Sequence, residues 1–256
     1  MQGQVALVTG AAGGIGEAVA RELAGRGAVV AAVDRDEEQL TETVGKLAAD
    51  GLDVTAYVTD VTDSDQVEKT VIRVEEQLGP VEMLVNAAGV LRLGEVVSYA
   101  EADWRVTFDV NVNGVFYLSR AVVGRMVSRT RGAVVTVASN AAATPRADMA
   151  AYAASKAAAT MFTKSLGLEV ARHGVRCNVV APGSTDTPML RSMWSDESSA
   201  QGTLEGNPGK YRVGIPTGRL ALPTDVAAAV AFLLSDEAKQ ITLHVLTVDG
   251  GASLGS

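Results

Sequence analysis

The sequence predicts a doubly wound α/β fold, in which helices cover both faces of one mainly parallel sheet. Short apolar runs rich in β-branched residues alternate with longer stretches of helical periodicity along the 256-residue chain. The short runs are apolar at nearly every position rather than at every second one, which is typical of strands buried on both faces. Because we find no repeat, low-complexity tract or linker, we expect one domain spanning residues 1–256.

The expected strands and helices alternate, and glycines mark several of their boundaries. Strands are expected at residues 5–8, 29–33, 54–58, 83–85, 134–137, 175–180 and 243–248. Helices are expected at residues 15–26, 37–49, 65–78, 101–127, 149–173 and 224–234. This repeated strand–helix order is the pattern of a parallel sheet with helical crossovers.

One stretch, residues 184 to about 222, breaks the alternation. It is rich in glycine, serine and polar residues but also carries Met189, Met193, Trp194 and Tyr211. Long excursions inside a compact domain are usually functional or disordered. The scattered large side chains predict a partly helical lid over an apolar ligand, although surface packing is an alternative explanation.

Composition excludes several classes of function. The 30 acidic and 22 basic residues give a net charge of −8, which disfavours binding to nucleic acid. A single cysteine, Cys177, excludes an intramolecular disulfide, and with only two histidines we expect no metal site. The apolar runs are too short to span a bilayer and the first residues lack a signal pattern, so we expect a cytoplasmic protein without a membrane partner.

A glycine-rich turn follows the first expected strand directly and opens the first expected helix. Glycine permits a tight turn and close approach of a diphosphate, and a helix N-terminus offers free N–H groups to the anion. This context predicts a dinucleotide site formed by Gly10, Gly13, Gly14, Ile15 and Gly16. The turn lacks the Lys-Ser/Thr ending of a nucleoside triphosphate loop, which argues against a kinase or an ATPase.

Asp34 follows the second expected strand, 24 residues after Gly10. A carboxylate at this position accepts hydrogen bonds from both ribose hydroxyls and repels a 2′-phosphate, so we expect NAD rather than NADP. The alternative is that Asp34 only caps the following helix. Asp60 and Val61, after the third strand, are candidates for the adenine pocket, although alone they indicate no more than a turn.

Three polar residues near the fifth expected strand form a candidate catalytic set. Ser139 ends that strand, and Tyr152 and Lys156 lie four residues apart on the next helix and therefore share a face. Tyrosine has an ordinary pKa of about 10, and an adjacent ammonium and a nicotinamide ring favour its phenolate. We therefore predict that Tyr152 is the general base, that Ser139 orients the substrate oxygen and that Lys156 also holds the nicotinamide ribose.

With the glycine turn and the Asn-Ala-Ala-Gly segment at residues 86–89, this ordered set resembles the short-chain dehydrogenase/reductase family over essentially the whole chain. The resemblance implies a Rossmann-like fold and a homotetramer with the last strand and tail at an interface. It implies that Asn111 joins the catalytic residues by carrying a water that links the lysine to solvent. It also implies that the cofactor contacts Tyr152 and Lys156 together with Asn86, Gly89, Pro182, Gly183 and Thr187.

Several segments resemble, more narrowly, the 2,3-dihydro-2,3-dihydroxybenzoate dehydrogenases of catechol siderophore synthesis. These segments are residues 86–94, 136–139, 144–146, 174–180, 183–187 and 241–243. The resemblance implies NAD-dependent oxidation of the C3 alcohol of a cyclohexadiene carboxylate, after which the ketone tautomerises to a phenol. Gain of aromaticity would draw this oxidation forward.

A carboxylate substrate requires a cation that the redox chemistry itself does not use. An arginine fork suits a carboxylate. Arg146 lies between two predicted catalytic residues and is the first candidate, and Arg92 is the second; either can instead be a surface cation. Ser139 is expected to contact the substrate alcohol, and Met189 and Trp194 are candidates to cover the ring or to pack against helices.

Three alternatives remain at this point. The substrate can be trans-2,3-dihydro-3-hydroxyanthranilate, an antibiotic precursor oxidised in the same way to 3-hydroxyanthranilate. Its C2 ammonium would favour a nearby carboxylate such as Asp148 or Asp186, whereas Asn140 suits either substrate. A carbonyl reductase using NADPH is disfavoured by Asp34, and a dinucleotide-binding protein without catalysis is disfavoured by the intact catalytic set.

Overall fold

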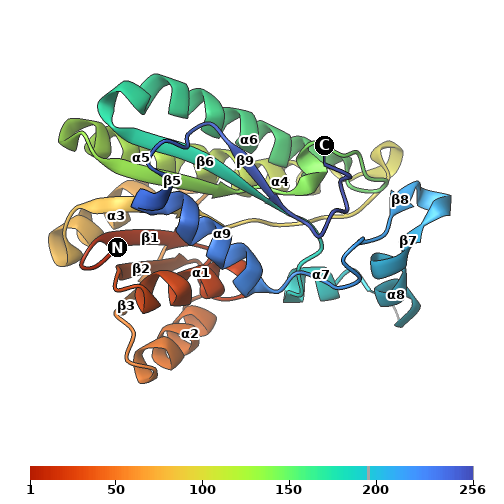
Figure 1. The fold of residues 1–256 in the computed structure, drawn as a ribbon, viewed down its shortest axis with the longest axis horizontal. Coiled ribbons are helices and arrows are strands. Elements are labelled where there is room, and N and C mark those ends of the chain that lie inside the picture. Colours follow the sequence, from red (N-terminus) through yellow and green to blue (C-terminus); the bar gives the residue numbers. More distant parts are fainter. Residues whose placement is uncertain (195–196, 256) are drawn as a thin grey trace.

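A computed structural model describes residues 1–194 and 197–255 of the chain (Figure 1). Its centre is a seven-stranded sheet of order β3-β2-β1-β4-β5-β6-β9, in which all neighbours pair in parallel. The strands are β1 (Val5–Thr9), β2 (Val29–Asp34), β3 (Val54–Val58), β4 (Val81–Asn86), β5 (Gly132–Val137), β6 (Val175–Pro182) and β9 (Val245–Val248). The predicted doubly wound α/β fold is confirmed.

Helices cover both faces of this sheet because its strands are apolar on both sides. In β1, Ala6 and Val8 pack into one buried cluster while Val5 and Leu7 pack into another. The first cluster is covered by α1 (Gly14–Gly25), α2 (Glu37–Ala49) and α9 (Pro223–Leu234). The second is covered mainly by α3 (Ser64–Leu78) and α5 (Gly114–Arg129), with α6 (Ala150–Val170) on the same face.

The predicted continuous helix over residues 101–127 is wrong in one respect. The structure divides it into α4 (Glu101–Phe108), a π-helical turn (Asp109–Asn113) and α5. The turn adds a residue without changing the polarity pattern, so periodicity cannot reveal it. Such turns are frequent at functional sites, and this one contains the buried Asn111.

Between β6 and α9 the chain leaves the sheet and forms a separate group of small elements, which project beyond the sheet in Figure 1. They are α7 (Pro188–Arg191), α8 (Glu197–Glu205), β7 (Gly206–Asn207), a 3₁₀ turn (Pro208–Lys210) and β8 (Arg212–Val213). β7 and β8 form an antiparallel hairpin that the sequence did not predict. The two ends of the segment meet where the Ala221 N–H donates to the Ser184 carbonyl at 3.1 Å.

The remaining sequence expectations concern membrane and metal. In the described ranges 1–194 and 197–255, no helix is both long and apolar enough to cross a membrane. The same ranges contain no cluster of three or more histidine, cysteine or acidic side chains that could hold a metal ion.

Candidate active site

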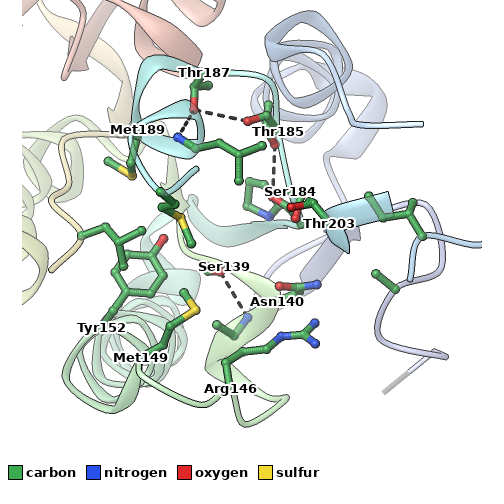
Figure 2. A pocket seen from close by; sticks show the side chains of 18 of the residues that line it. Ser139, Asn140, Arg146, Met149, Tyr152, Ser184, Thr185, Thr187, Met189 and Thr203 are labelled. Carbon is green, nitrogen blue, oxygen red and sulfur yellow. Dashed lines mark hydrogen bonds between the residues drawn. The ribbon is translucent and has the colours of Figure 1, made fainter. Parts of the chain in front are cut away.

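A pocket opens at the carboxyl ends of β5 and β6, the edge where ligands bind in open parallel sheets. Figure 2 shows Ser139, Tyr152 and Arg146 around this one cavity, with Met149 and Met189 beside them. Further lining residues come from the segment after β6: Ser184, Thr185, Thr187, Leu190, Met193, Thr203, Arg212, Val213 and Ile215. The sheet therefore supplies one wall of the pocket, and the segment between β6 and α9 supplies another.

The structure brings Ser139, Tyr152 and Lys156 together, in the arrangement that the sequence predicts. Ser139 follows β5 and its Oγ accepts a hydrogen bond from the Ala141 N–H at 3.1 Å, which fixes the side chain. Tyr152 and Lys156 lie on one face of α6, with the Lys156 Nζ 5.8 Å from the centre of the tyrosine ring. Lys156 is buried and its Nζ donates to the Val137 carbonyl at 2.9 Å.

Burial shifts the two titratable groups of this set in opposite directions. Burial raises the pKa of Tyr152, and its hydrogen bond with Ser139 lowers it by a smaller amount. Burial also lowers the pKa of Lys156 to about 8. The sequence predicts that the ammonium lowers the pKa of the tyrosine, but in the protein without cofactor burial is the larger effect because the charged phenolate loses solvation.

Lys156→Met is expected to remove a pH-dependent part of the free energy of unfolding. Because the folded pKa of Lys156 is about 8 and the ordinary value is 10.5, the unfolded chain binds more protons in this window. The contribution of Lys156 to the free energy of unfolding therefore rises as the pH increases from 8 to 10.5, by ~3 kcal/mol at most. Urea unfolding of both proteins across the window measures the difference; a difference that does not change with pH would contradict the assignment.

Asn111 lies next to the lysine but its side chain binds the backbone beside Gly89. The amide oxygen accepts from the Val90 N–H at 2.9 Å, and the amide nitrogen donates to the Val90 carbonyl at 3.0 Å and to the Ser155 Oγ at 2.9 Å. A Cβ at Gly89 would lie 3.2 Å from the Lys156 Nζ and 3.4 Å from the Asn111 Oδ1. Gly89 therefore lets the chain pass close to both predicted catalytic residues.

The glycine turn has the shape that a diphosphate requires. Gly10 has φ +69°, and a Cβ there would lie 2.8 Å from the backbone of Ala88. Gly16 allows α1 to pack on the turn, since a Cβ there would meet the Gly10 carbonyl oxygen at 2.0 Å. Gly13 precedes α1 without a side-chain cap and faces open space. The exposed backbone at the start of α1 therefore fits a dinucleotide diphosphate.

Asp34 is positioned beside this turn at the end of β2. Its Oδ2 accepts from the Ala12 N–H at 3.2 Å and its Oδ1 from the Asp36 N–H at 3.2 Å. The alternative that Asp34 caps the following helix is wrong, because Asp36 is the N-cap of α2 and accepts from the Gln39 N–H at 3.1 Å. Asp34 therefore lies against the glycine turn, where each of its carboxylate oxygens accepts one backbone N–H.

Some of the other predicted cofactor residues bond or pack within the fold, and others line the pocket. Asp60 Oδ1 accepts from both the N–H and the hydroxyl of Thr62, and Val61 is buried against Gly114. Asn86 is also buried, and its Nδ2 donates to Ser119 and Thr136 at 3.3 and 3.4 Å, so it links the end of β4 to α5 and β5. Lining the pocket itself are Ile15, Pro182, Gly183 and Thr187. Thr187 also caps α7 by accepting from the Leu190 N–H (Figure 2).

Of the predicted substrate residues, the structure brings Arg146 and Met189 to the pocket but not Arg92 or Trp194. Arg92 is exposed and its Nε lies 3.6 Å from the Asp103 Oδ1, which gives it a surface partner instead. The Trp194 indole N–H donates to the Thr203 hydroxyl at 3.2 Å, which directs this edge of the ring toward α8. Arg92 was proposed from its place in the chain, which does not determine side-chain direction, and Trp194 was proposed as a large side chain of the segment after β6, with packing against helices as the alternative.

Sequence reasoning missed Arg212. This residue lies on β8, and its guanidinium enters the same pocket as Arg146. It sits in a polar stretch with no periodicity, so only the folded hairpin shows where it points. Asn140, which was considered only for the C2 substituent, also lines the pocket and donates to the Asp249 carboxylate at 3.1 Å.

Comparison with known proteins agrees with this geometry. Residues 4–198 match the model of the short chain dehydrogenase family. The chain is 51% identical over 255 residues to the 2,3-dihydro-2,3-dihydroxybenzoate dehydrogenase of Bacillus subtilis strain 168, covering 100% of this chain and 98% of that protein. It is 41% identical to the Escherichia coli K12 enzyme of the same name, covering 99% and 98% of the two chains.

A solved structure extends the similarity to the fold. Levodione reductase superposes with a TM-score of 0.93 at 29% identity, and the match covers 100% of both chains. The protein belongs to the short-chain dehydrogenase family. It is therefore an oxidoreductase of a family whose members use NAD or NADP.

Proposed function

We propose that this protein oxidises the C3 alcohol of 2,3-dihydro-2,3-dihydroxybenzoate to the phenol with NAD, as a step in siderophore or related secondary-metabolite biosynthesis. The observation that carries the proposal is Arg146, which places a cation in the same pocket as Ser139 and Tyr152. A guanidinium suits a carboxylate close to the reacting alcohol. The names of the two curated relatives support this substrate class.

The chemistry assigns one task to each side chain. The Tyr152 phenolate takes the proton of the C3 hydroxyl, and Ser139 holds that oxygen by a hydrogen bond. A nicotinamide bound beside Tyr152 would supply the hydride acceptor for C3 and a positive ring that favours the phenolate. Lys156 holds the nicotinamide ribose, and its buried ammonium also favours the phenolate. The resulting ketone then tautomerises to the aromatic phenol, so the net change is the loss of one hydride to the nicotinamide and one proton to Tyr152.

The pocket favours a C2 hydroxyl over a C2 amine. The two carboxylates considered for an ammonium are engaged elsewhere: Asp148 pairs with Lys210 at 2.8 Å and Asp186 with Arg191 at 2.7 Å. None of the described residues that line the pocket is acidic. NADH formation from the dihydroxy acid and from its amino counterpart, assayed side by side, tests this proposal. Faster turnover of the amino counterpart than of the dihydroxy acid would overturn the proposal, and so would the absence of turnover with both compounds.

Asp34→Ala is expected to lower the ratio of kcat/KM for NAD over NADP by ~10- to 100-fold. The variant loses charged hydrogen bonds to the ribose and the repulsion of a 2′-phosphate. Asp36→Ala is the matched control, because the Asp36 side chain caps α2 by accepting from the Gln39 N–H. This control should lose ~1 kcal/mol of stability and keep the coenzyme ratio. An unchanged ratio in Asp34→Ala would mean that the ribose is recognised elsewhere.

We also propose that the protein is a cytoplasmic homotetramer. Large apolar side chains remain exposed on α4, α5 and α6, and such groups on one side of a monomer usually mark an interface. They are 45%, 39%, 60% and 72% exposed at Trp104, Phe116, Met161 and Leu168. Light scattering should give about four times the 26.4 kDa chain mass; a monomer would refute the assembly.

A further inference from the structure

Two arginines line the pocket, although one carboxylate requires only one guanidinium. Arg146 comes from the loop between β5 and α6, and Arg212 comes from β8 of the hairpin. Neither forms an ion pair with any part of the chain that the structure describes. By contrast, Arg191 and Arg219 of the same segment are both paired with aspartates. The pocket therefore concentrates positive charge that its own lining does not neutralise.

This arrangement disfavours the charged state of both groups. Burial lowers the pKa of Arg212, and the nearby charge of Arg146 lowers it further. Burial also lowers the pKa of Arg146, which Asp249 only partly offsets. The Asp249 carboxylate already accepts hydrogen bonds from Asn140 and Ser253. Two partly desolvated like charges destabilise each other until an anion lies between them.

Arg212 is held in place rather than free to swing into solvent. Its Nη2 donates to the Ser184 Oγ at 2.8 Å. The hairpin that carries it is tightly packed, since a Cβ at Gly206 would lie 2.6 Å from the Gly214 nitrogen. The Lys210 Nζ, next to the hairpin, pairs with the Asp148 carboxylate at 2.8 Å. This exposed ion pair links the hairpin to the loop that carries Arg146.

We propose that Arg212 and Arg146 together form a two-arginine site for the carboxylate of the ring substrate. This inference rests on the proposed function, which supplies the carboxylate. Arg212 is then a specificity-determining residue that acts on the non-reacting end of the substrate. The segment between β6 and α9 contributes recognition of the acid, and the sheet contributes the redox chemistry.

The test compares Arg212→Gln with Arg219→Gln, a surface arginine of the same segment. For 2,3-dihydro-2,3-dihydroxybenzoate, Arg212→Gln should raise KM by ~10- to 100-fold and leave kcat within about threefold, since a charged hydrogen bond is lost far from the reacting atoms. For trans-3,5-cyclohexadiene-1,2-diol, which has no carboxylate, neither constant should change. Arg219→Gln should behave as wild type with both. Equal effects on acid and diol would overturn the site.

A double-mutant cycle with Arg146→Gln separates a shared site from two independent ones. If both groups bind one carboxylate, the two changes in KM combine non-additively, whereas strict additivity would refute a joint site. Arg212→Lys keeps the charge but loses the fork, and its KM should lie between those of wild type and Arg212→Gln. The midpoint of thermal unfolding of Arg212→Gln should not fall, because a like-charge repulsion is removed. A lowered midpoint with unchanged KM would show a purely structural residue.

Equilibrium binding distinguishes failure of this inference from failure of the proposed function. We expect titration of 2-hydroxybenzoate into the enzyme with NAD to give a Kd for Arg212→Gln that is higher than the wild-type Kd by ~10-fold or more. If wild type oxidises neither ring acid but this loss is seen, the proposed reaction fails and the two-arginine site stands. If wild type oxidises the dihydroxy acid and the affinities are equal, the site fails and the reaction stands.

Discussion

Tyr152→Phe is expected to lower kcat for alcohol oxidation by ~10³-fold, while the affinity for NAD stays close to that of wild type. The ring that packs in the pocket is kept, and only the oxygen that accepts the substrate proton is lost. Lys156 is expected to stay bonded to the Val137 carbonyl in the variant, so the proposed ribose contact should be retained. Steady-state kinetics with saturating NAD measures the first quantity, and a fluorescence titration of NADH measures coenzyme binding.

The same substitution at Tyr211 is the control for that experiment. Tyr211 lies in the segment after β6, is 96% exposed and is not among the residues that line the pocket. Tyr211→Phe should therefore match wild type in both measurements. A Tyr152→Phe protein that turns over at the wild-type rate would remove this residue from the chemistry, and weakened NAD binding alone would give it only a structural role.

Among substitutions that add one methyl group to the glycine turn, we expect Gly16→Ala to be the most destabilising. The new Cβ would lie 2.0 Å from the Gly10 carbonyl oxygen, which is backbone and cannot rotate away. Either α1 moves off the turn or the turn opens, at a cost of ~3 kcal/mol or more. We expect a lowered midpoint of thermal unfolding and the loss of measurable NAD binding.

Gly25→Ala gives the matched comparison because it changes the same residue type near the other end of α1. A Cβ there meets nothing within 4 Å, and alanine favours a helix over glycine. This variant should bind NAD as wild type does and be equally or more stable. Equal stability and coenzyme binding in Gly16→Ala and wild type would show that α1 does not depend on this close contact.

The fold was predictable because a parallel strand that is buried on both faces is apolar at nearly every position. Continuous apolar runs located the strands, and polar residues just after them, such as Ser139, were placed at the carboxyl edge. The π-helical turn around Asn111 was not predictable, since it disturbs hydrogen bonds without disturbing polarity. The hairpin of β7 and β8 has strands of only two residues, too short for any period to appear.

The site was predictable where the spacing was local and not where it depended on how loops converge. Tyr152 and Lys156 share a helix face at any position of that helix, so their neighbourhood follows from sequence alone. Arg92 and Arg212 show the opposite situation. Arg92 lies near a motif in the chain but turns to Asp103, whereas Arg212 is distant in sequence and enters the pocket. Which loop reaches across is decided by tertiary packing.

The hydrogen bond between Ala221 and Ser184 brings together the two ends of the segment that holds Arg212. Because these two ends are adjacent, residues between them can be lengthened, shortened or exchanged with little strain on the strands. Changes confined to the segment between β6 and α9 can therefore alter which substrate is accepted while the residues that carry out the redox reaction stay unchanged. We therefore expect that exchanging this segment between relatives changes which acids they accept.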